Sequence, residues 1–367
     1  MNKKTIALIL IAFFAAGFAN AVDLEISGEI KTGLFWQKVD SDNPDENFNR
    51  ASIHHNDDAG PNEGRFRMNM HLTTGNVGMR VRFEQTAWTG SAPIRWSYAF
   101  AYSNFLDEQL MVTLGMLGES PWSAGGPDIW QELDDQIGIR TEIMPNFIPG
   151  LNLGFVLNRW NQMMYFEDRE TLGDILMESV FGIAYTNDYF HGRFSWRLDG
   201  DADVYNHQQE GMSMMYRLEA RVVEMYVPNL SVYANGWWRG IGAVEDQQER
   251  RNFLYVDYTP EAFSTELRLG LDLVGSKSHL FHAGAGFYYN IFPFLDAGVF
   301  GRYIHNFGEA SVLDTVALRI EPQVRLDFGN FYAALVYSYN NEYFQRTGQD
   351  PGMRTRQWLN LRTVITF

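Results

Sequence analysis

Apolar and polar residues alternate one by one along much of this chain, and this alternation limits the possible folds more than any other feature. From 65 to 74, one set of alternate positions holds Phe66, Met68, Met70 and Leu72, whereas the other set is polar and rich in arginine. Alternate side chains of a β-strand point to opposite faces of a sheet, whereas a helical period of 3.6 residues would scatter the charges over every face. The pattern predicts a sheet with one apolar and one charged face.

The same alternation recurs along 23–36, 77–84, 266–273 and 318–327. No stretch beyond residue 21 approaches the twenty apolar residues that a membrane helix needs, yet aromatic residues make up 15% of the chain. A sheet that faces lipid must close on itself, because lipid offers no partner to the backbone groups of an open edge. We therefore expect an all-β fold, a transmembrane antiparallel up-and-down β-barrel.

Short connections alternate with long polar segments, and the number of short connections predicts the strand count. The short turns lie near 75–76, 104–108, 145–150, 187–188, 225–229, 260–263, 291–294 and 329–330. The long loops cover 37–64, 118–136, 160–175, 199–212, 239–250, 304–316 and 341–353. Eighteen strands are favoured, with sixteen as the alternative if the weakly patterned 251–258 is a loop. Pro322 lacks the N–H that a central strand donates, so we expect a bulge or a strand boundary there.

The beginning of the chain has the features of an export signal. Lys3 and Lys4 precede an apolar run that is too short to span a membrane, and Ala19-Asn20-Ala21 places small residues two apart. We expect a cleaved signal peptide over 1–21, followed by one barrel domain over 22–367. A retained N-terminal anchor is the alternative.

Composition argues against several other classes of protein. The chain has 45 acidic and 29 basic residues, and this negative balance disfavours nucleic acid as a partner. It has no cysteine, so disulfides and thiolate metal sites are excluded. No nucleophile motif accompanies the histidines expected to face inward, so we expect neither an enzyme nor a cofactor.

One acidic segment has the spacing of a calcium-binding loop. Its carboxylates occupy positions 1, 3, 5 and 12 of that loop and are Asp199, Asp201, Asp203 and Glu210. Val204 stands where such loops need glycine, so an ordinary acidic loop is the favoured interpretation, and we expect no metal site.

The last strand alternates up to the final residue of the chain. Leu361, Ile365 and the terminal Phe367 share one face, and this strand resembles the C-terminal signal of outer-membrane proteins. The resemblance implies recognition by the barrel-assembly machinery and a place in the lipid of the bacterial outer membrane. Both ends of the mature chain would then lie on the periplasmic side.

The charged face should line the inside of the barrel, where it carries a group of arginines on consecutive strands. These are Arg65, Arg67, Arg80, Arg82 and Arg95. The Gly/Pro-rich loop 118–136 carries the carboxylates Glu119, Asp128, Glu132, Asp134 and Asp135. Its position in the chain resembles the third external loop of general porins, which folds inward and places acids across from arginines. The resemblance implies a constriction at these ten residues and a homotrimer; an ordinary solvated loop is the alternative.

A barrel of sixteen to eighteen strands is wide enough for an aqueous channel. We therefore predict an outer-membrane porin through which small hydrophilic solutes and ions diffuse passively, with a weak preference for anions at the waist. One alternative is a substrate-selective channel for sugars or small anions, although the aromatic residues expected inside are scattered: Phe35, Tyr255, Tyr288, Phe300 and Tyr332. A surface adhesin that uses the long acidic loops is the other.

Overall fold

The computed structural model describes 23–53, 65–85, 94–118, 120–124, 137–159, 179–197, 212–242, 248–275, 278–307, 316–344 and 352–367. The expected signal peptide at 1–21 lies outside these residues. Almost the whole described chain is strand, and it contains no helix of the length and hydrophobicity needed to cross a membrane.

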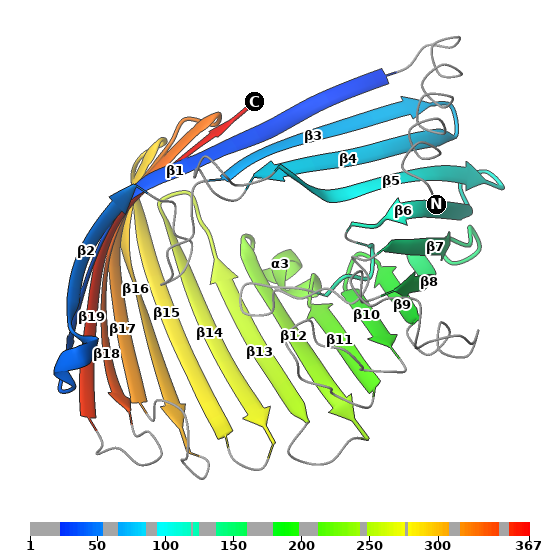
Figure 1. Ribbon diagram of the computed structural model, residues 1–367. Helices are drawn as coiled ribbons and strands as arrows, with labels where there is room; N and C mark the ends of the chain where they lie inside the picture. The colour runs from blue at the N-terminus through cyan, green and yellow to red at the C-terminus, as the bar shows by residue number, and fades with distance from the viewer. Residues whose placement is uncertain are drawn as a thin grey trace, which may run out of the picture.

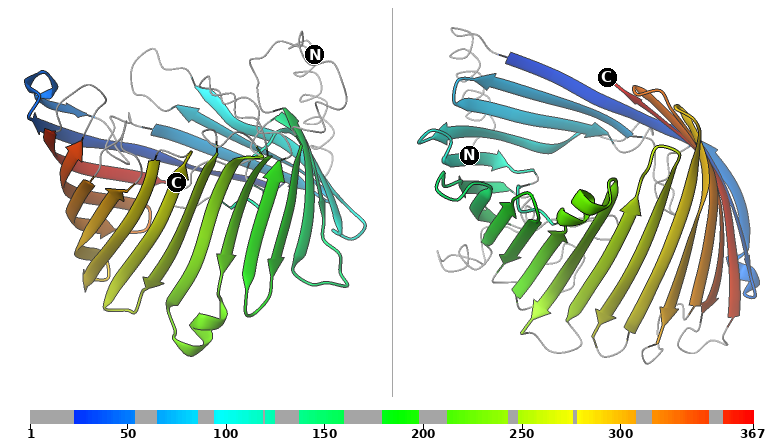
Figure 2. Two further views of the ribbon diagram at one scale, coloured as in Figure 1. Left: turned by 90° about the horizontal axis from the view of Figure 1, so that it is seen from below. Right: turned by 180° about the vertical axis from the view of Figure 1, so that it is seen from behind.

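Nineteen strands follow one another and pair antiparallel. They are β1 (Asp23–Ser41), β2 (Phe48–Ile53), β3 (Arg65–Thr74), β4 (Val77–Gln85), β5 (Arg95–Phe105), β6 (Leu110–Met116), β7 (Ile137–Ile143), β8 (Leu151–Arg159), β9 (Val180–Thr186), β10 (His191–Arg197), β11 (Met212–Glu219), β12 (Leu230–Ile241), β13 (Glu249–Tyr258), β14 (Phe263–Val274), β15 (Ser278–Phe292), β16 (Leu295–Asn306), β17 (Val316–Asp327), β18 (Phe331–Phe344) and β19 (Gly352–Thr366). Within the described residues, two short helical turns interrupt them, the 3₁₀ helix η1 (Pro44–Glu46) and the helix α3 (Val222–Tyr226). Figures 1 and 2 show the strands side by side around one curved wall.

The wall closes because β1 pairs with β19 along one edge and with β2 and β3 along the other. β3 contacts Asp23–Lys31 of β1, and β2 contacts Leu34–Val39, so these two short strands share one position in the wall. The result is a closed antiparallel barrel of 18 strand positions, as the favoured count predicted. The weakly patterned 251–258 belongs to β13 and is not a loop.

Alternation along each strand separates an apolar outer face from an inner face, which we call the lumen face. On β1, Leu34 is 55% exposed on the outside, whereas its neighbour Phe35 is 2% exposed and points inward. The other aromatic residues expected inside, such as Tyr255, Tyr288 and Phe300, are likewise buried on the lumen face. The alternation in the sequence therefore predicted the register of the wall.

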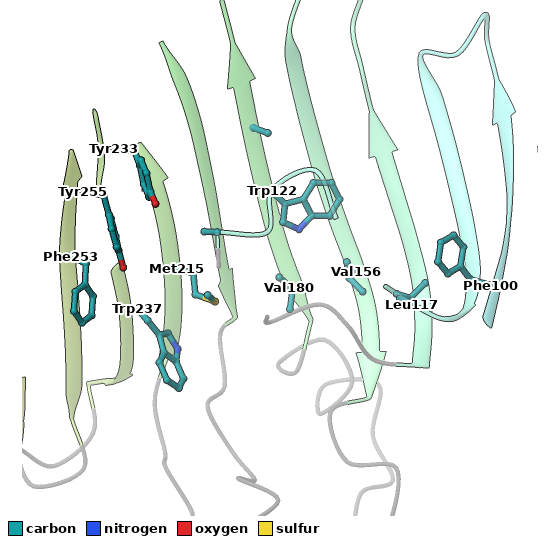
Figure 3. Close-up of a cluster of buried hydrophobic side chains, with 12 residues drawn as sticks. Phe100, Leu117, Trp122, Val156, Val180, Met215, Tyr233, Trp237, Phe253 and Tyr255 are labelled. Carbon is teal, nitrogen blue, oxygen red and sulfur yellow. The ribbon is translucent and has the colours of Figure 1, made fainter. Parts of the chain in front are cut away.

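The lumen face also carries an apolar cluster that the alternation did not predict. It extends from Phe100 on β5 through Leu117 and Trp122, which follow β6, to Tyr233 on β12 and Tyr255 on β13. Figure 3 shows these side chains along the strands, with Trp122 on the connecting segment that lies over them. The barrel is therefore packed against its own loop on this side and is not lined by charge throughout.

Three local expectations were wrong in detail. Part of the expected loop 37–64 is strand, because β1 continues to Ser41 and β2 returns along it. The expected turn at 225–229 begins inside the helix α3, which ends at Tyr226 (Figure 1). Pro322 causes no bulge. It pairs with Val299 of β16, and the pairing of β17 with β18 is interrupted at this point but continues beyond it in the same register. The missing N–H thus costs a ladder bond without shifting the strand.

The two ends of the described chain meet at the closing seam of the barrel. The backbone N–H of Gly28 donates to Phe367 O at 2.8 Å, and the N–H of Phe367 donates back to Gly28 O at 3.1 Å. The Phe367 ring lies over Gly28, since a Cβ at that glycine would come within 2.5 Å of the ring. Leu361 and Ile365 pair with Leu34 and Ile30 of β1. Of the three residues expected to form the assembly signal, Leu361 and Ile365 lie on β19, and Phe367 directly follows it at the seam.

Candidate functional site: a loop held on the lumen wall

The arginines expected inside lie together on β3 and β4. Arg65 Nη2 is 2.9 Å from Glu29 Oε1, and Arg67 Nε is 2.9 Å from Glu84 Oε2, so these two guanidiniums are paired with carboxylates across the wall. Arg80 is exposed, and it forms no hydrogen bond or ion pair with any other described residue. A permanently charged, exposed guanidinium inside a barrel gives the lumen a local positive potential.

Arg82 connects this group to the loop after β6. Its Nε donates to Asn69 Oδ1 at 2.7 Å, and its guanidinium lies 4.6 Å from the centre of the Tyr98 ring. Gly118, at the start of the loop, lies against the same ring, because a Cβ there would be 3.2 Å from Tyr98 Cδ1. Arg95 is placed opposite Glu84 by the backbone register of β4 and β5. The structure thus brings the arginines and the beginning of the loop to one part of the lumen face.

Two further arginines hold the loop by its backbone. Arg140 Nη1 on β7 donates to Gly118 O at 2.9 Å, and Arg193 Nη1 on β10 donates to Ser123 O at 3.2 Å. Arg140 is 4% exposed and its Nε lies 3.0 Å from Oε1 of Glu142, which is 1% exposed. Asn152 Nδ2 donates to the other oxygen of Glu142 at 3.0 Å. Because the buried charge is paired and hydrogen-bonded, the guanidinium can stay in place to hold the loop.

Trp122 fixes the middle of this segment on the wall. Its indole is fully buried and lies over Gly154 of β8 and Gly182 of β9. A Cβ at Gly154 would come within 1.8 Å of the indole, and one at Gly182 within 2.1 Å. Both glycines face the lumen and are cross-strand partners in the β8–β9 register. Only glycine leaves space for the ring at these two positions, so the wall contains a seat for Trp122.

The segment from Leu117 to Ala124, without residue 119, therefore lies on the lumen face. The five carboxylates expected in the constriction, Glu119, Asp128, Glu132, Asp134 and Asp135, lie outside the described residues, so their distances to the arginines stay a prediction. The sequence also contained a signal for the seat that we did not use. Gly154 and Gly182 interrupt the lumen-facing positions of two neighbouring strands, and a tryptophan, Trp122, precedes them in a Gly/Pro-rich loop.

The acidic segment with calcium-loop spacing, Asp199, Asp201, Asp203 and Glu210, is likewise outside the described residues. Within the part of the chain that the structure describes, no group of three or more His, Asp or Glu side chains could hold a metal ion.

Comparisons with known proteins support the fold. The chain matches no family model and no curated protein. Among solved structures, it resembles an anion-selective porin from Comamonas acidovorans with a TM-score of 0.54 and 8% identity, covering 95% of this chain and 100% of that one. It also resembles the outer-membrane channel DcaP of Acinetobacter baumannii, with a TM-score of 0.53 and 8% identity over 95% and 98% of the two chains. It also resembles OmpT of the Vibrio cholerae outer membrane, with a TM-score of 0.50 and 10% identity over 95% of this chain and 98% of that one. At these identities the likeness shows a porin-like fold.

Proposed function

We propose that this chain is an outer-membrane porin, a water-filled channel for the passive diffusion of small hydrophilic solutes and ions. The observation that carries the proposal is the closed wall of 18 strand positions, whose apolar outer face suits lipid and whose lumen face bears arginines and carboxylates. Barrels of sixteen to eighteen strands leave an aqueous channel. The described part of the loop, 117–118 and 120–124, lies against one side of the wall, and we infer that it narrows such a channel.

We propose that the narrowest part lies between this loop and the arginines of β3 to β5. Arg65, Arg67, Arg80, Arg82 and Arg95 would form its basic side, and Glu119, Asp128, Glu132, Asp134 and Asp135 its acidic side. Opposed rows of fixed charge orient polar solutes by dipole and charge. The exposed guanidinium of Arg80 and the wall position of Arg82 favour a modest preference for anions.

The proposal also implies how the chain would be exported, inserted into the membrane and assembled. The chain would be exported by the signal at 1–21 and inserted by the barrel-assembly machinery, with both mature ends in the periplasm. Phe367, Ile365 and Leu361 would act in that insertion, because they complete the seam with β1. Three copies would assemble in the membrane, an arrangement that we infer from the porin-like fold.

Swelling of liposomes that contain the refolded barrel tests this function. Uncharged sugars of increasing size should enter at rates that fall steadily with size and rise in proportion to concentration. Liposomes with the heat-unfolded chain provide the control. Swelling no faster than in the control, from barrels shown to be inserted by their change in gel mobility on heating, would contradict an open channel. Saturation with a single sugar would indicate a selective channel instead.

A further inference from the structure

His191 begins β10 on the lumen face, and neither the proposed constriction nor the seat of Trp122 uses it. Both nitrogens of its ring make a contact. Thr186 Oγ1 of β9 lies 2.5 Å from Nδ1, and the Nε–H of Arg193 donates to Nε2 at 2.6 Å. Thr186 is the cross-strand partner of His191, so the register of the two strands positions the hydroxyl at the ring. The wall thus holds this histidine between a hydroxyl and a guanidinium.

These two contacts define which ring nitrogen carries the proton. The Nε–H of an arginine can only donate, so Nε2 of His191 must be unprotonated and accept. The single proton of the neutral ring then lies on Nδ1, which donates it to Thr186 Oγ1. The arrangement requires a neutral ring, because an imidazolium would present an N–H to a donor only 2.6 Å away.

Arg193 connects this histidine to the loop on the lumen wall. Its Nε donates to His191, and its Nη1 donates to Ser123 O at 3.2 Å. A guanidinium is a rigid planar fork, so these two donors cannot move independently. Ser123 directly follows Trp122, which Figure 3 shows on the segment that lies over the strands. The contact between Arg193 and the ring therefore positions the donor that holds the loop.

Charged groups from β10, from β11 and from the segment after β11 act on His191. Its cross-strand partner on β11 is Glu219, and the partner of Arg193 on the same strand is Arg217. On the other side, β9 presents uncharged residues at both facing positions, and the described loop residues 120–124 carry no charge. The groups that act on the ring are the guanidiniums of Arg193, Arg217 and Arg221 and the carboxylate of Glu219.

We propose that His191 is a pH-sensitive latch for the loop, an inference whose effect on the current rests on the proposed function. Acid adds a proton from solvent to Nε2, whose lone pair can then no longer accept from Arg193. Two cations would face each other at hydrogen-bond distance, with two more guanidiniums nearby, so the Arg193 side chain turns away. Its Nη1 leaves Ser123 O, and the segment loosens there, while the contacts at Gly118 O and Trp122 remain.

Thiol labelling tests the latch without requiring conduction, because the chain has no cysteine. Ser123 is 6% exposed, so the thiol of Ser123→Cys reacts only when the segment leaves the wall. A dipyridyl disulfide is the reagent, since it reacts with thiols in acid as well as at neutral pH. Each rate is divided by that of the heat-unfolded chain at the same pH. We expect this ratio to rise about tenfold from about pH 7.5 to about pH 4.5, the size of one lost hydrogen bond of a charged group.

Two substitutions separate the histidine from general effects of acid. His191→Gln keeps an acceptor for Arg193 and a donor for Thr186 but cannot be protonated, so its labelling ratio should be the same at both pH values. Arg193→Gln removes the guanidinium. Its labelling ratio should already be about tenfold higher at neutral pH and should not rise further in acid.

His282→Gln is the matched control, since His282 is also a buried lumen histidine in contact with an arginine. Its partners Asp272 and Arg302 lie on β14 and β16, whereas the latch lies on β9 to β11. This variant should therefore keep the tenfold rise in acid. Gel mobility before and after heating, measured at both pH values, verifies that each barrel stays folded.

The current in planar bilayers connects the latch to the channel. A barrel whose loop loosens should switch between current levels about tenfold more often in acid, and His191→Gln should remove this change. A labelling ratio that does not rise in acid, or that rises equally in His191→Gln, would overturn the latch while leaving the proposed channel in place. A rise that His282→Gln also removes would overturn it too, because the whole wall would then respond. Acid-dependent labelling of an inserted barrel that conducts nothing would support the latch and contradict the open channel.

Discussion

The Trp122→Ala substitution should loosen the loop on the lumen face without unfolding the barrel. The indole is fully buried over Gly154 and Gly182, whereas the arginine hydrogen bonds to Gly118 O and Ser123 O do not involve it. Replacing a buried tryptophan by alanine costs about 3–5 kcal/mol in a packed core. Since the two arginine contacts remain, we expect the loop to stay on the wall but to open about two to four orders of magnitude more often.

Thiol labelling measures this opening directly, because the chain has no cysteine. Ser123 is 6% exposed, so a cysteine placed there by Ser123→Cys reacts with a maleimide only when the segment leaves the wall. In the Ser123→Cys barrel, Trp122→Ala should raise the labelling rate by about the same factor as the frequency of loop opening. Trp96→Ala is the matched control, because Trp96 is 51% exposed on the outer face.

The labelling rates show whether the packing of Trp122 holds the loop on the wall. A rate that rises by less than about threefold in Trp122→Ala would refute the reasoning, since the lost packing would then contribute under 1 kcal/mol. An equal rise in Trp96→Ala would show that the whole wall had loosened instead. Gly154→Ala should act like Trp122→Ala, because its methyl group would occupy space that the indole fills.

Three further substitutions have defined outcomes. Arg82→Gln removes a lumen cation, so the chloride-to-sodium permeability ratio, read from the reversal potential in a salt gradient, should fall by about a factor of two, as expected for one charge near the Debye length. Glu142→Ala leaves Arg140 buried without its carboxylate, and urea unfolding in vesicles should show a loss of about 3–5 kcal/mol. Gly28→Leu forces the Phe367 ring off the seam, so the yield of folded barrel after refolding should fall several-fold.

Each of these substitutions has a control of the same kind elsewhere in the barrel. Arg250→Gln removes a cation from the outer face of β13, and an equal change in selectivity there would contradict a lumen effect. Asp40→Ala breaks the exposed pair with Lys38 and should cost under about 1 kcal/mol; a loss as large as that of Glu142→Ala would argue against burial as the cause. Gly301→Leu should refold normally, and failure there would mean that any added bulk blocks assembly.

The sequence predicted the barrel well because lipid enforces alternation on every strand. The neighbours Leu34 and Phe35 fall on opposite faces, as their positions indicated. Alternation was weak along 251–258, where the polar Asn252 lies on the outer face and the apolar Phe253 and Tyr255 lie on the lumen face. The Oδ1 of Asn252 accepts hydrogen bonds from Tyr216 Oη at 2.8 Å and from Trp238 Nε1 at 2.9 Å. Its polar group is therefore satisfied on the outer face of β13.

The candidate site was predictable only in part. The positions of the arginines on β3 and β4 follow from strand register, which the alternation predicts, whereas their role in a constriction stays a prediction. The seat of Trp122 depends on contacts between a loop and strands that lie more than thirty positions later in the chain, which no local pattern encodes. The role of Arg140 in holding Gly118 O follows from the path of the loop, which a sequence pattern does not define.

Single-channel conductance of the refolded barrel in a planar bilayer tests the central claim most directly. The proposal predicts stable current steps of nanosiemens order, the scale of a channel wide enough to hold water, with groups of three if the barrel is a trimer. A salt gradient in the same experiment should give a reversal potential of the sign expected for anions. Silence from barrels that are inserted and change gel mobility on heating would contradict the open channel.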